Sequence, residues 1–211
     1  MHVRQTLAIL KQHQFFVKTS KCVFGLQELE YLGHIITNHE VKVDENKIAA
    51  MVAWPRPTNI SELRGFLELT RYYRKFVKNY SIVARALNNL LKKGQFGWHE
   101  EVETAFLALK QVMTTAPTLA MPNFKDVFTV ETDASGNGIG AVLTKQGKPM
   151  VFMSRALGVA KTSWSTYSKE MLAIIEAICL WRPYLLRRKL YIQTDQRSLK
   201  YLLEQCITTP E

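Results

Sequence analysis

The second half of the sequence follows one order of strand and helix patterns, and this order restricts the fold more than any other feature. Apolar runs bounded by glycine and proline predict strands, and an apolar period of about 3.6 residues predicts a helix. We predict strands over residues 128–132, 138–144 and 149–154, a long helix over residues 166–185 and a strand over residues 191–194. The order β, β, β, α, β, followed by the start of another helix, predicts an α/β protein with a mixed sheet and flanking helices.

The first half has a different pattern, in which amphipathic helices dominate. Asp44 can cap a helix that residues 54–57 must end, because the prolines there cannot continue it. Asn59 and Glu62 resemble a capping box, and apolar residues then recur at helical spacing as far as Val77. A short helix over residues 3–10, strands around residues 15–17 and 31–37, and a helix over residues 101–113 complete this part. The pattern changes between about residues 93 and 120, which predicts a domain boundary there.

The positive charge is concentrated in the first half. Of the net charge of +10, residues 1–95 contribute +8, from 15 Lys/Arg against 7 Asp/Glu, and residues 96–211 contribute +2, from 13 against 11. A positive surface attracts polyphosphates through counterion release, without reading their sequence. The alternative is a basic protein whose surface is merely well solvated.

Four basic residues lie along the second helix of the first half, and aromatic residues lie between them. The basic residues are Arg71, Arg74, Lys75 and Lys78, and the aromatic residues are Tyr72, Tyr73, Phe76 and Tyr80. Such a basic ridge can follow a nucleic-acid backbone, because cations contact phosphates and rings stack on bases. An amphipathic helix with a solvated basic face explains the same residues, so both interpretations stay open.

Asp133, Glu170 and Asp195 are the acidic residues that the predicted fold can bring together. Asp133 and Asp195 each end a predicted strand, and the carboxyl ends of parallel neighbouring strands meet at one edge of a sheet. Glu170 lies in the first turns of the long helix, at the edge of its apolar stripe. Each acid alone has a plainer role, as a turn residue, a helix cap or a surface charge. We set aside Glu131 as an exposed strand residue, and Glu176 because it lies roughly 120° around the helix from Glu170.

The chemistry of three converging carboxylates indicates a metal site. Without basic neighbours such groups repel one another, so their cluster is stable when a divalent cation neutralises it. Mg²⁺ suits the cluster, because this ion uses a few carboxylates and completes its octahedron with water and substrate phosphate. A pair of ions would explain phosphodiester cleavage, since one generates the attacking hydroxide and the other stabilises the leaving oxygen.

The sequence argues against several other classes of protein. Cys22, Cys179 and Cys206 are odd in number and far apart, which predicts neither a disulfide framework nor a cysteine metal knuckle, and favours a reducing, intracellular setting. No run approaches the roughly 20 apolar residues of a membrane span, and the N-terminus lacks the apolar stretch of a signal peptide. We therefore expect a soluble protein without a membrane partner.

Several motifs in the right order resemble the Pol polyprotein of gypsy-type LTR retrotransposons. The segment EYLGHII, residues 30–36, resembles the reverse transcriptase hairpin that holds the primer end. The segments LRGFL and YYRKFV, residues 63–67 and 72–77, resemble the thumb that follows. Three further segments resemble successive parts of a ribonuclease H domain: TDAS at residues 132–135, YSKE at residues 167–170 and TDQRSLKYL at residues 194–202.

The resemblance implies three domains. Residues 1–43 would be the end of the palm with a primer-grip-like hairpin, residues 44–120 the thumb and connection, and residues 121–211 a ribonuclease H-like domain with a mixed sheet. Gly33 and His34 of the hairpin, and Arg64 together with the basic ridge, would then bind nucleic acid. The fourth ribonuclease H acid of the family lies in a later helix, beyond Glu211, so this domain is expected to be C-terminally truncated.

The resemblance also implies an activity. Asp133, Glu170 and Asp195 would be the first three catalytic and metal-binding acids, and would cleave the RNA strand of an RNA:DNA hybrid with Mg²⁺ or Mn²⁺. The polymerase aspartates of the family lie upstream, so we do not expect DNA polymerisation. A catalytically inactive nucleic-acid-binding remnant, and a structural subunit for a separate polymerase chain, are the alternatives.

The implied partners are the hybrid, DNA or RNA backbones and the rest of a Pol polyprotein, with the polymerase domain upstream and the integrase downstream. The implied location is a cytoplasmic particle that later enters the nucleus.

Replacing Arg71, Arg74 and Lys78 together by glutamate tests the basic ridge. We expect weaker binding to every nucleic-acid sequence and a flatter dependence of affinity on salt, because fewer phosphate counterions are released. Fluorescence anisotropy with labelled duplexes over a salt series measures both quantities. Unchanged affinity at about 50 mM salt would show that the ridge is only a solvated helix face.

Overall fold

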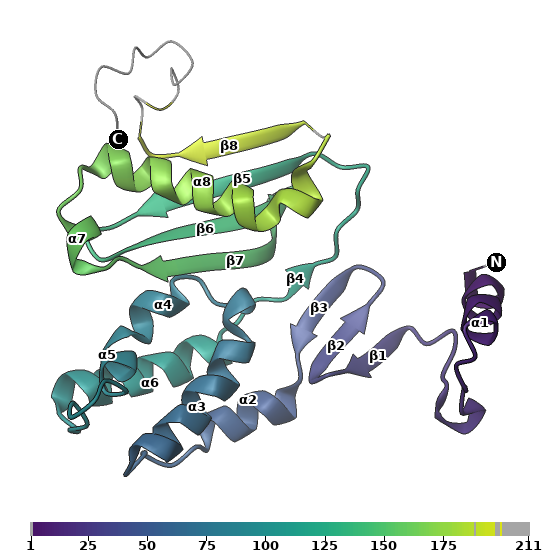
Figure 1. The fold of residues 1–211 in the computed structure, drawn as a ribbon, viewed down its shortest axis with the longest axis horizontal. Helices are drawn as coiled ribbons and strands as arrows, with labels where there is room; N and C mark the ends of the chain where they lie inside the picture. The colour runs from purple at the N-terminus through teal and green to yellow at the C-terminus, as the bar shows by residue number, and fades with distance from the viewer. Residues whose placement is uncertain (1, 188, 197–198, 200–211) are drawn as a thin grey trace.

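Two four-stranded sheets and a group of helices make up the part of the chain described by the computed structural model, residues 2–187, 189–196 and 199 (Figure 1). The first sheet has the strand order β1-β2-β3-β4 and the second has the order β7-β6-β5-β8. The helices α2 to α6 lie beside both sheets, and α8 lies across one face of the second sheet (Figure 1). The predicted α/β class, with a mixed second sheet, is confirmed.

The elements have the following bounds. The helices are α1 His2–Gln12, α2 Glu45–Val52, α3 Ile60–Tyr72, α4 Tyr80–Val83, α5 Arg85–Asn89, α6 Glu100–Thr114, α7 Val159–Thr162 and α8 Thr166–Leu185, with 3₁₀ turns η1 Thr19–Lys21 and η2 Arg74–Phe76. The strands are β1 Glu28–Tyr31, β2 His34–Thr37, β3 Glu40–Val43, β4 Leu119–Ala120, β5 Phe128–Ala134, β6 Gly138–Lys145, β7 Lys148–Ala156 and β8 Leu190–Thr194.

Side-chain caps fix the starts of the predicted helices. The Asp44 carboxylate accepts a hydrogen bond of 2.8 Å from the Asn46 amide at the start of α2. The Asn59 side chain accepts one of 3.0 Å from the Glu62 amide at the start of α3, and the Glu62 carboxylate accepts one of 2.8 Å from the Thr58 amide. Both caps satisfy amides that have no partner inside the helix, so both predicted helix starts are confirmed.

Helices α2 to α6 enclose the first core. Its fully buried side chains include Met51 of α2, Phe66 of α3, Leu87 of α5 and Phe106 and Leu109 of α6. We call α2 to α6, with the turns between them, the helical body. Helix α6 belongs to it because its apolar side is buried in this core, although α6 follows residue 93, where the predicted boundary region begins. The domain boundaries predicted at residues 43 and 120 stay predictions.

Three local predictions are wrong. Residues 15–17 form no strand, since they have no neighbouring strand to bond with and Phe16 is fully exposed. The single strand that the apolar pattern predicted over residues 31–37 is interrupted at Leu32 and Gly33, which both have positive φ and reverse the chain between β1 and β2. The hairpin that the motif at residues 30–36 indicated is present. The helix predicted as far as Val77 ends at Tyr72, and η2 then redirects the chain so that Phe76 and Val77 stay buried.

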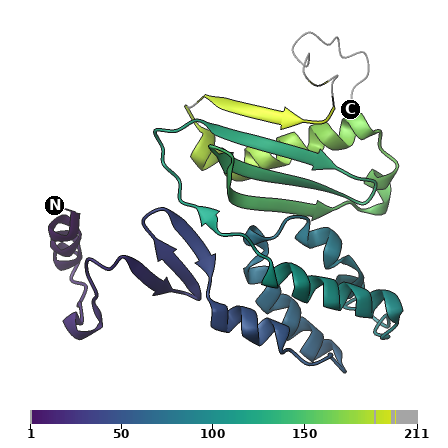
Figure 2. The same cartoon turned by 180° about the vertical axis from the view of Figure 1, so that it is seen from behind.

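The second sheet contains antiparallel and parallel pairs. Strands β5, β6 and β7 form an antiparallel meander, and Gln146 and Gly147, both with positive φ, make the tight turn between the last two. The long helix α8 then crosses over, so that β8 returns parallel to β5. Helix α8 lies in front of the strands in Figure 1 and behind them in Figure 2, and it buries Ala177 and Trp181 against the sheet.

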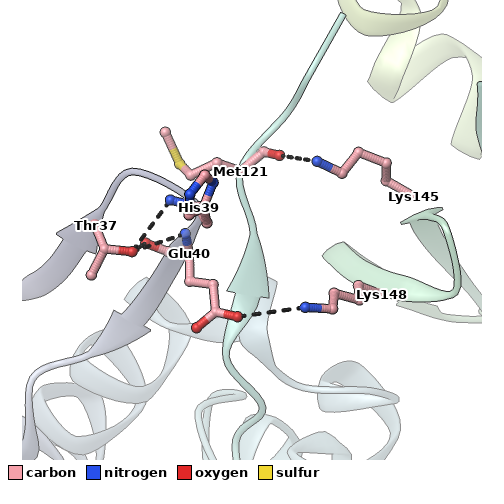
Figure 3. Close-up of polar contacts among 6 residues, drawn as sticks. All are labelled: Thr37, His39, Glu40, Met121, Lys145 and Lys148. Atoms are coloured by element: carbon pink, nitrogen blue, oxygen red, sulfur yellow. Dashed lines mark hydrogen bonds and ion pairs between the residues drawn. The ribbon is translucent and has the colours of Figure 1, made fainter. Parts of the chain in front are cut away.

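The two sheets are joined by a short segment around β4. Strand β4 pairs with β3, and beyond it the Met121 amide donates to the His39 carbonyl at 2.7 Å (Figure 3). The Lys145 ammonium donates to the Met121 carbonyl at 3.2 Å, and Lys148 forms an ion pair with Glu40 at 3.8 Å (Figure 3). The β6–β7 turn is thereby attached to the first sheet.

Within the described residues, no helix combines the length and the apolar character that crossing a membrane requires.

Substituting Gly33 by alanine tests how tightly the hairpin packs on α3. Left-handed backbone costs an L-residue roughly 1–2 kcal/mol, and a Cβ on Gly33 would also lie 2.4 Å from the Tyr73 hydroxyl. Gly94 is the matched control, because it has a similar φ and no atom within 4 Å of a built Cβ. We expect Gly33→Ala to lower the free energy of unfolding in urea more than Gly94→Ala, and Tyr73→Phe to recover part of the excess. Equal losses for the two alanine variants would contradict this packing.

Candidate active site and nucleic-acid surface

The parallel pairing of β5 with β8 places two of the predicted acids. The register of these strands ends with Thr132 opposite Thr194, so Asp133 and Asp195 follow at the same end of the sheet. Both side chains are exposed, and both line one polar pocket of about 230 Å³. The predicted approach of Asp133 to Asp195 is therefore present in the structure.

Glu170 reaches the same strand ends from α8. Its carboxylate accepts a hydrogen bond of 2.9 Å from the Ala134 amide and one of 3.1 Å from the Thr194 hydroxyl. Ala134 follows Asp133, and Thr194 precedes Asp195, so Glu170 is hydrogen-bonded to a neighbour of each of the other two acids. The side chain is only 3% exposed, although it is a carboxylate.

The surroundings of Glu170 favour its protonated form. Burial raises the pKa of the Glu170 carboxyl above its ordinary value, and the negative charges of Asp133 and Asp195 raise it further. The hydrogen bonds from Thr194 and Ala134 act in the opposite direction but do not cancel the rise. A cation near the three acids would relieve this repulsion.

The three acids approach the strand ends from two faces of the sheet. Asp133 alternates along β5 with Val130 and Thr132, which are buried on the α8 side, so its side chain leaves the sheet on the opposite face. Glu170 comes from the α8 face. Among the described residues no group of three or more His, Cys, Asp or Glu side chains is placed to hold a metal ion. The shared metal site stays a prediction.

The pocket beside Asp133 and Asp195 also contains residues that the sequence did not single out. Glu131 lines it and accepts a hydrogen bond of 3.0 Å from the Thr144 hydroxyl, so this half-buried residue is not the exposed strand residue that we predicted. Asn79 lines it from the helical body. Period-two alternation from Asp133 gives a signal for Glu131, whereas only the packing of the two halves reveals Asn79.

The basic residues of the ridge are exposed, and some of them line two different pockets. Arg64, Arg71, Arg74, Lys75 and Lys78 all present exposed side chains. Arg74 and Lys75 line a second, larger cleft between the first sheet, η2 and α8, whereas Lys78 lines the pocket of Asp133 and Asp195. The end of the predicted ridge thus adjoins both pockets.

The turn of the β1–β2 hairpin is fixed to the end of α3. The Tyr72 hydroxyl donates to the Leu32 carbonyl at 3.0 Å, and the Tyr73 hydroxyl donates to the Gly33 carbonyl at 3.2 Å. The His34 ring lies 5.4 Å from both tyrosine rings, between centroids. Burial raises the pKa of the Tyr73 hydroxyl above its ordinary value, so this group stays protonated and able to donate to a higher pH than a free tyrosine. The structure thus unites Gly33 and His34 with the aromatic residues of the ridge.

The comparison with protein families defines the class of the second half. Residues 98–192 match the family described as the RNase H-like domain found in reverse transcriptase. The match begins just before α6 and includes β5 to β7, α8 and the beginning of β8. This part of the chain is an RNase H-like reverse transcriptase segment.

Several curated proteins resemble the chain over most of its length. It is 39% identical over 188 residues to the retrovirus-related Pol polyprotein from transposon 297 of Drosophila melanogaster, covering 88% of this chain and 18% of the polyprotein. It is 32% identical over 215 residues to the polyprotein from transposon gypsy of the same organism, covering 95% of this chain and 21% of that polyprotein. An uncharacterized mitochondrial protein of Arabidopsis thaliana is 50% identical over 126 residues, covering 59% of this chain and 80% of that protein.

The chain belongs to the retrovirus-related Pol polyprotein family of retrotransposons, as its motifs predicted. It spans about a fifth of the length of the Pol polyproteins reported above.

Solved structures share the fold at low sequence identity. The foamy viral protease-reverse transcriptase dRH in complex with double-stranded DNA matches with a TM-score of 0.82 at 18% identity, and the match covers 97% of this chain and 37% of that chain. The foamy viral protease-reverse transcriptase in complex with an RNA/DNA hybrid matches with a TM-score of 0.79 at 18% identity, and the match covers 96% of this chain and 29% of that chain. Both halves of the chain thus share the fold of the corresponding parts of this viral protein.

Substituting Glu170 by glutamine tests the raised pKa of this carboxyl, which burial and the charges of Asp133 and Asp195 cause. A raised pKa means that the folded protein holds the proton more tightly, so the wild type loses stability as pH rises from the ordinary carboxyl range through the raised pKa. Glutamine keeps the shape, can accept from Ala134 and can donate to Thr194, but carries no charge. We expect the stability of Glu170→Gln, relative to wild type in urea, to increase over this pH rise. A relative stability that is constant or falls with pH would contradict the raised pKa of Glu170.

Proposed function

We propose that the chain binds RNA:DNA hybrid and hydrolyses its RNA strand with divalent metal ions. The observation that carries the proposal is the placement of Asp133 and Asp195 at the ends of adjacent parallel strands, with Glu170 bonded to Ala134 and Thr194 beside them. The RNase H-like family match supports the reaction class. A structural neighbour in complex with an RNA/DNA hybrid supports the substrate class.

The donor chemistry of the three acids fits Mg²⁺ or Mn²⁺. Asp133 and Asp195 offer exposed carboxylates, and Glu170 adds a buried one whose charge the other two oppose. Bound ions would supply an activated hydroxide and stabilise the leaving oxygen. Since the described side chains do not gather round one point, we propose that Asp133, Glu170 and Asp195 change rotamer when they hold a cation.

The first half of the chain would supply most of the affinity for nucleic acid. The exposed cations Arg64, Arg71, Arg74, Lys75 and Lys78 would contact phosphates. The hairpin turn with Gly33 and His34, fixed by the hydroxyls of Tyr72 and Tyr73, would contact the backbone near a strand end. These contacts carry no sequence information, so binding would be unspecific and sensitive to salt.

A specific observation also favours the second candidate, a nucleic-acid-binding remnant without catalysis. One oxygen of Glu170 accepts from Ala134 and the other accepts from Thr194, so both are already engaged. A change of rotamer that breaks either bond to bring Glu170 to a cation would cost free energy, and this cost lowers the affinity for metal.

The remaining proposals concern the wider setting of the chain. We propose a polymerase domain upstream and an integrase downstream in a Pol polyprotein, and an intracellular location that includes the cytoplasm and the nucleus.

Incubating the chain with a labelled RNA:DNA hybrid tests the activity. We expect RNA cleavage that is faster with Mn²⁺ than with Mg²⁺, because Mn²⁺ binds more tightly to most ligand sets and is less demanding in geometry. Asp133→Asn should abolish cleavage. Asp126→Asn is the matched control, since Asp126 pairs with Lys145 near the opposite end of β5 and should leave cleavage unchanged. Cleavage that survives Asp133→Asn would show that the site is misassigned, and binding without any cleavage would favour the inactive remnant.

A further inference from the structure

We propose that Lys78 and Asn79, which belong to the helical body, form one wall of the polar pocket of Asp133 and Asp195. There they would position the phosphodiester backbone of the substrate against the two acids. The inference deepens the proposed function and rests on it. It assigns to these two residues a positioning role at the acidic site, which differs from a general contact along the basic ridge.

Buried residues on both sides hold the Lys78-Asn79 segment in place. Val77 is 3% exposed and Tyr80 is 5% exposed, and both belong to the first core. The Tyr80 hydroxyl lies 3.0 Å from the Thr70 hydroxyl, with which it shares a hydrogen bond. The chain enters and leaves the core within four residues, so the two residues between are presented outwards and cannot retract.

The residues that follow dock this segment onto the second sheet. The Ser81 amide donates to the Ser154 hydroxyl at 2.9 Å, and the Ser81 hydroxyl donates to the Ser154 carbonyl at 2.8 Å. Ile82 packs against Gly138, where a built Cβ would lie 2.9 Å from the Ile82 side chain. These contacts join the start of α4 to β6 and β7, so the distance between the segment and the sheet is fixed.

The backbone of Asn79 directs its side chain over the acidic strand. Asn79 has a φ of 57°, in the left-handed region that asparagine tolerates better than most residues. Its amide oxygen would lie 3.0 Å from a Cβ built on Gly140, and Gly140 is the register partner of Asp133. The absence of a side chain at Gly140 therefore leaves room for Asn79 beside Asp133.

The charges of the pocket fit a phosphodiester together with a divalent cation. Lys78 and Asn79 line one wall, and Glu131, Asp133 and Asp195 line the other. No ion pair joins Lys78 to any carboxylate of the described residues, so its ammonium is not neutralised by these acids. An anion alone would be repelled by the acids, and a cation alone would gain nothing from Lys78. A phosphate with a bound metal ion fits both sides of the pocket, because the metal ion faces the acids and a phosphate oxygen faces the Lys78 ammonium.

Cross-linking in the full chain tests where Lys78 meets the substrate. The three cysteines, Cys22, Cys179 and Cys206, are first replaced by serine, and Lys78→Cys or Asp195→Cys then carries a photoactivatable group. We expect both positions to cross-link to the same or adjacent nucleotides of a bound RNA:DNA hybrid. Cross-links from position 78 that lie several nucleotides from those of position 195, or none at all, would overturn the inference. Because this readout needs no cleavage, the inference and the proposed nuclease activity can fail separately.

Affinity and kinetics distinguish positioning from a structural effect. Lys78→Ala should weaken hybrid binding about tenfold and reduce the salt slope by about 0.9, the value for one phosphate contact. For cleavage we expect a higher KM and a lower kcat, with Lys78→Arg restoring most of both. Lys93→Ala removes the same charge from an exposed turn outside the pocket and should change neither binding nor kinetics. Equal effects of Lys78→Ala and Lys93→Ala, or no rescue by arginine, would overturn the positioning role.

Discussion

The parallel pairing of β5 with β8 is the constraint on which the site depends. It requires the crossover through α8, and its register sets Asp133 beside Asp195. A slip of one residue along β8 would turn every side chain of that strand to the other face of the sheet, and Asp195 with them. The same crossover brings Glu170 to the strand ends, where its bonds to Ala134 and Thr194 tie the helix to both strands. The register of β5 with β8, together with the crossover through α8, therefore sets the positions of all three acids.

The second constraint is the docking of the helical body on the sheet. Hydrogen bonds between Ser81 and Ser154, and the close fit of Ile82 on Gly138, bring the segment after η2 to the edge of the acidic pocket. Strand β4 attaches the two sheets at a separate point. A nucleic acid bound by the first half would thus reach the second half at a defined place. This arrangement gives a physical reason for the two halves to occur together in the reverse transcriptase fold.

The sequence predicted those features that depend on local patterns. The caps at Asp44 and Asn59 and the bounds of α8 follow from short-range chemistry. The parallel pairing of the acid-bearing strands was a condition of the predicted site, and the structure meets it. The prediction failed where long-range packing decides. The apolar pattern missed the reversal at Leu32 and Gly33, which tyrosine hydroxyls 40 residues away stabilise, and only the motif at residues 30–36 indicated it. The place of Asn79 depends on a glycine on another strand. The alternation of buried and exposed residues along β5 predicts that Asp133 lies on the face opposite Val130 and Thr132. Only the structure shows that α8 covers the face of Val130, so that Glu170 comes from the other side of the sheet.

Binding of Mn²⁺ in the presence of an uncleavable hybrid tests the central claim most directly. The electron paramagnetic resonance signal of free Mn²⁺ counts the ions that the complex takes up. The account predicts saturable uptake by the wild type that Asp133→Asn, Glu170→Gln and Asp195→Asn each weaken strongly, while Asp126→Asn leaves it unchanged. Equal uptake by all five proteins would contradict the claim that these three acids form one metal-dependent site.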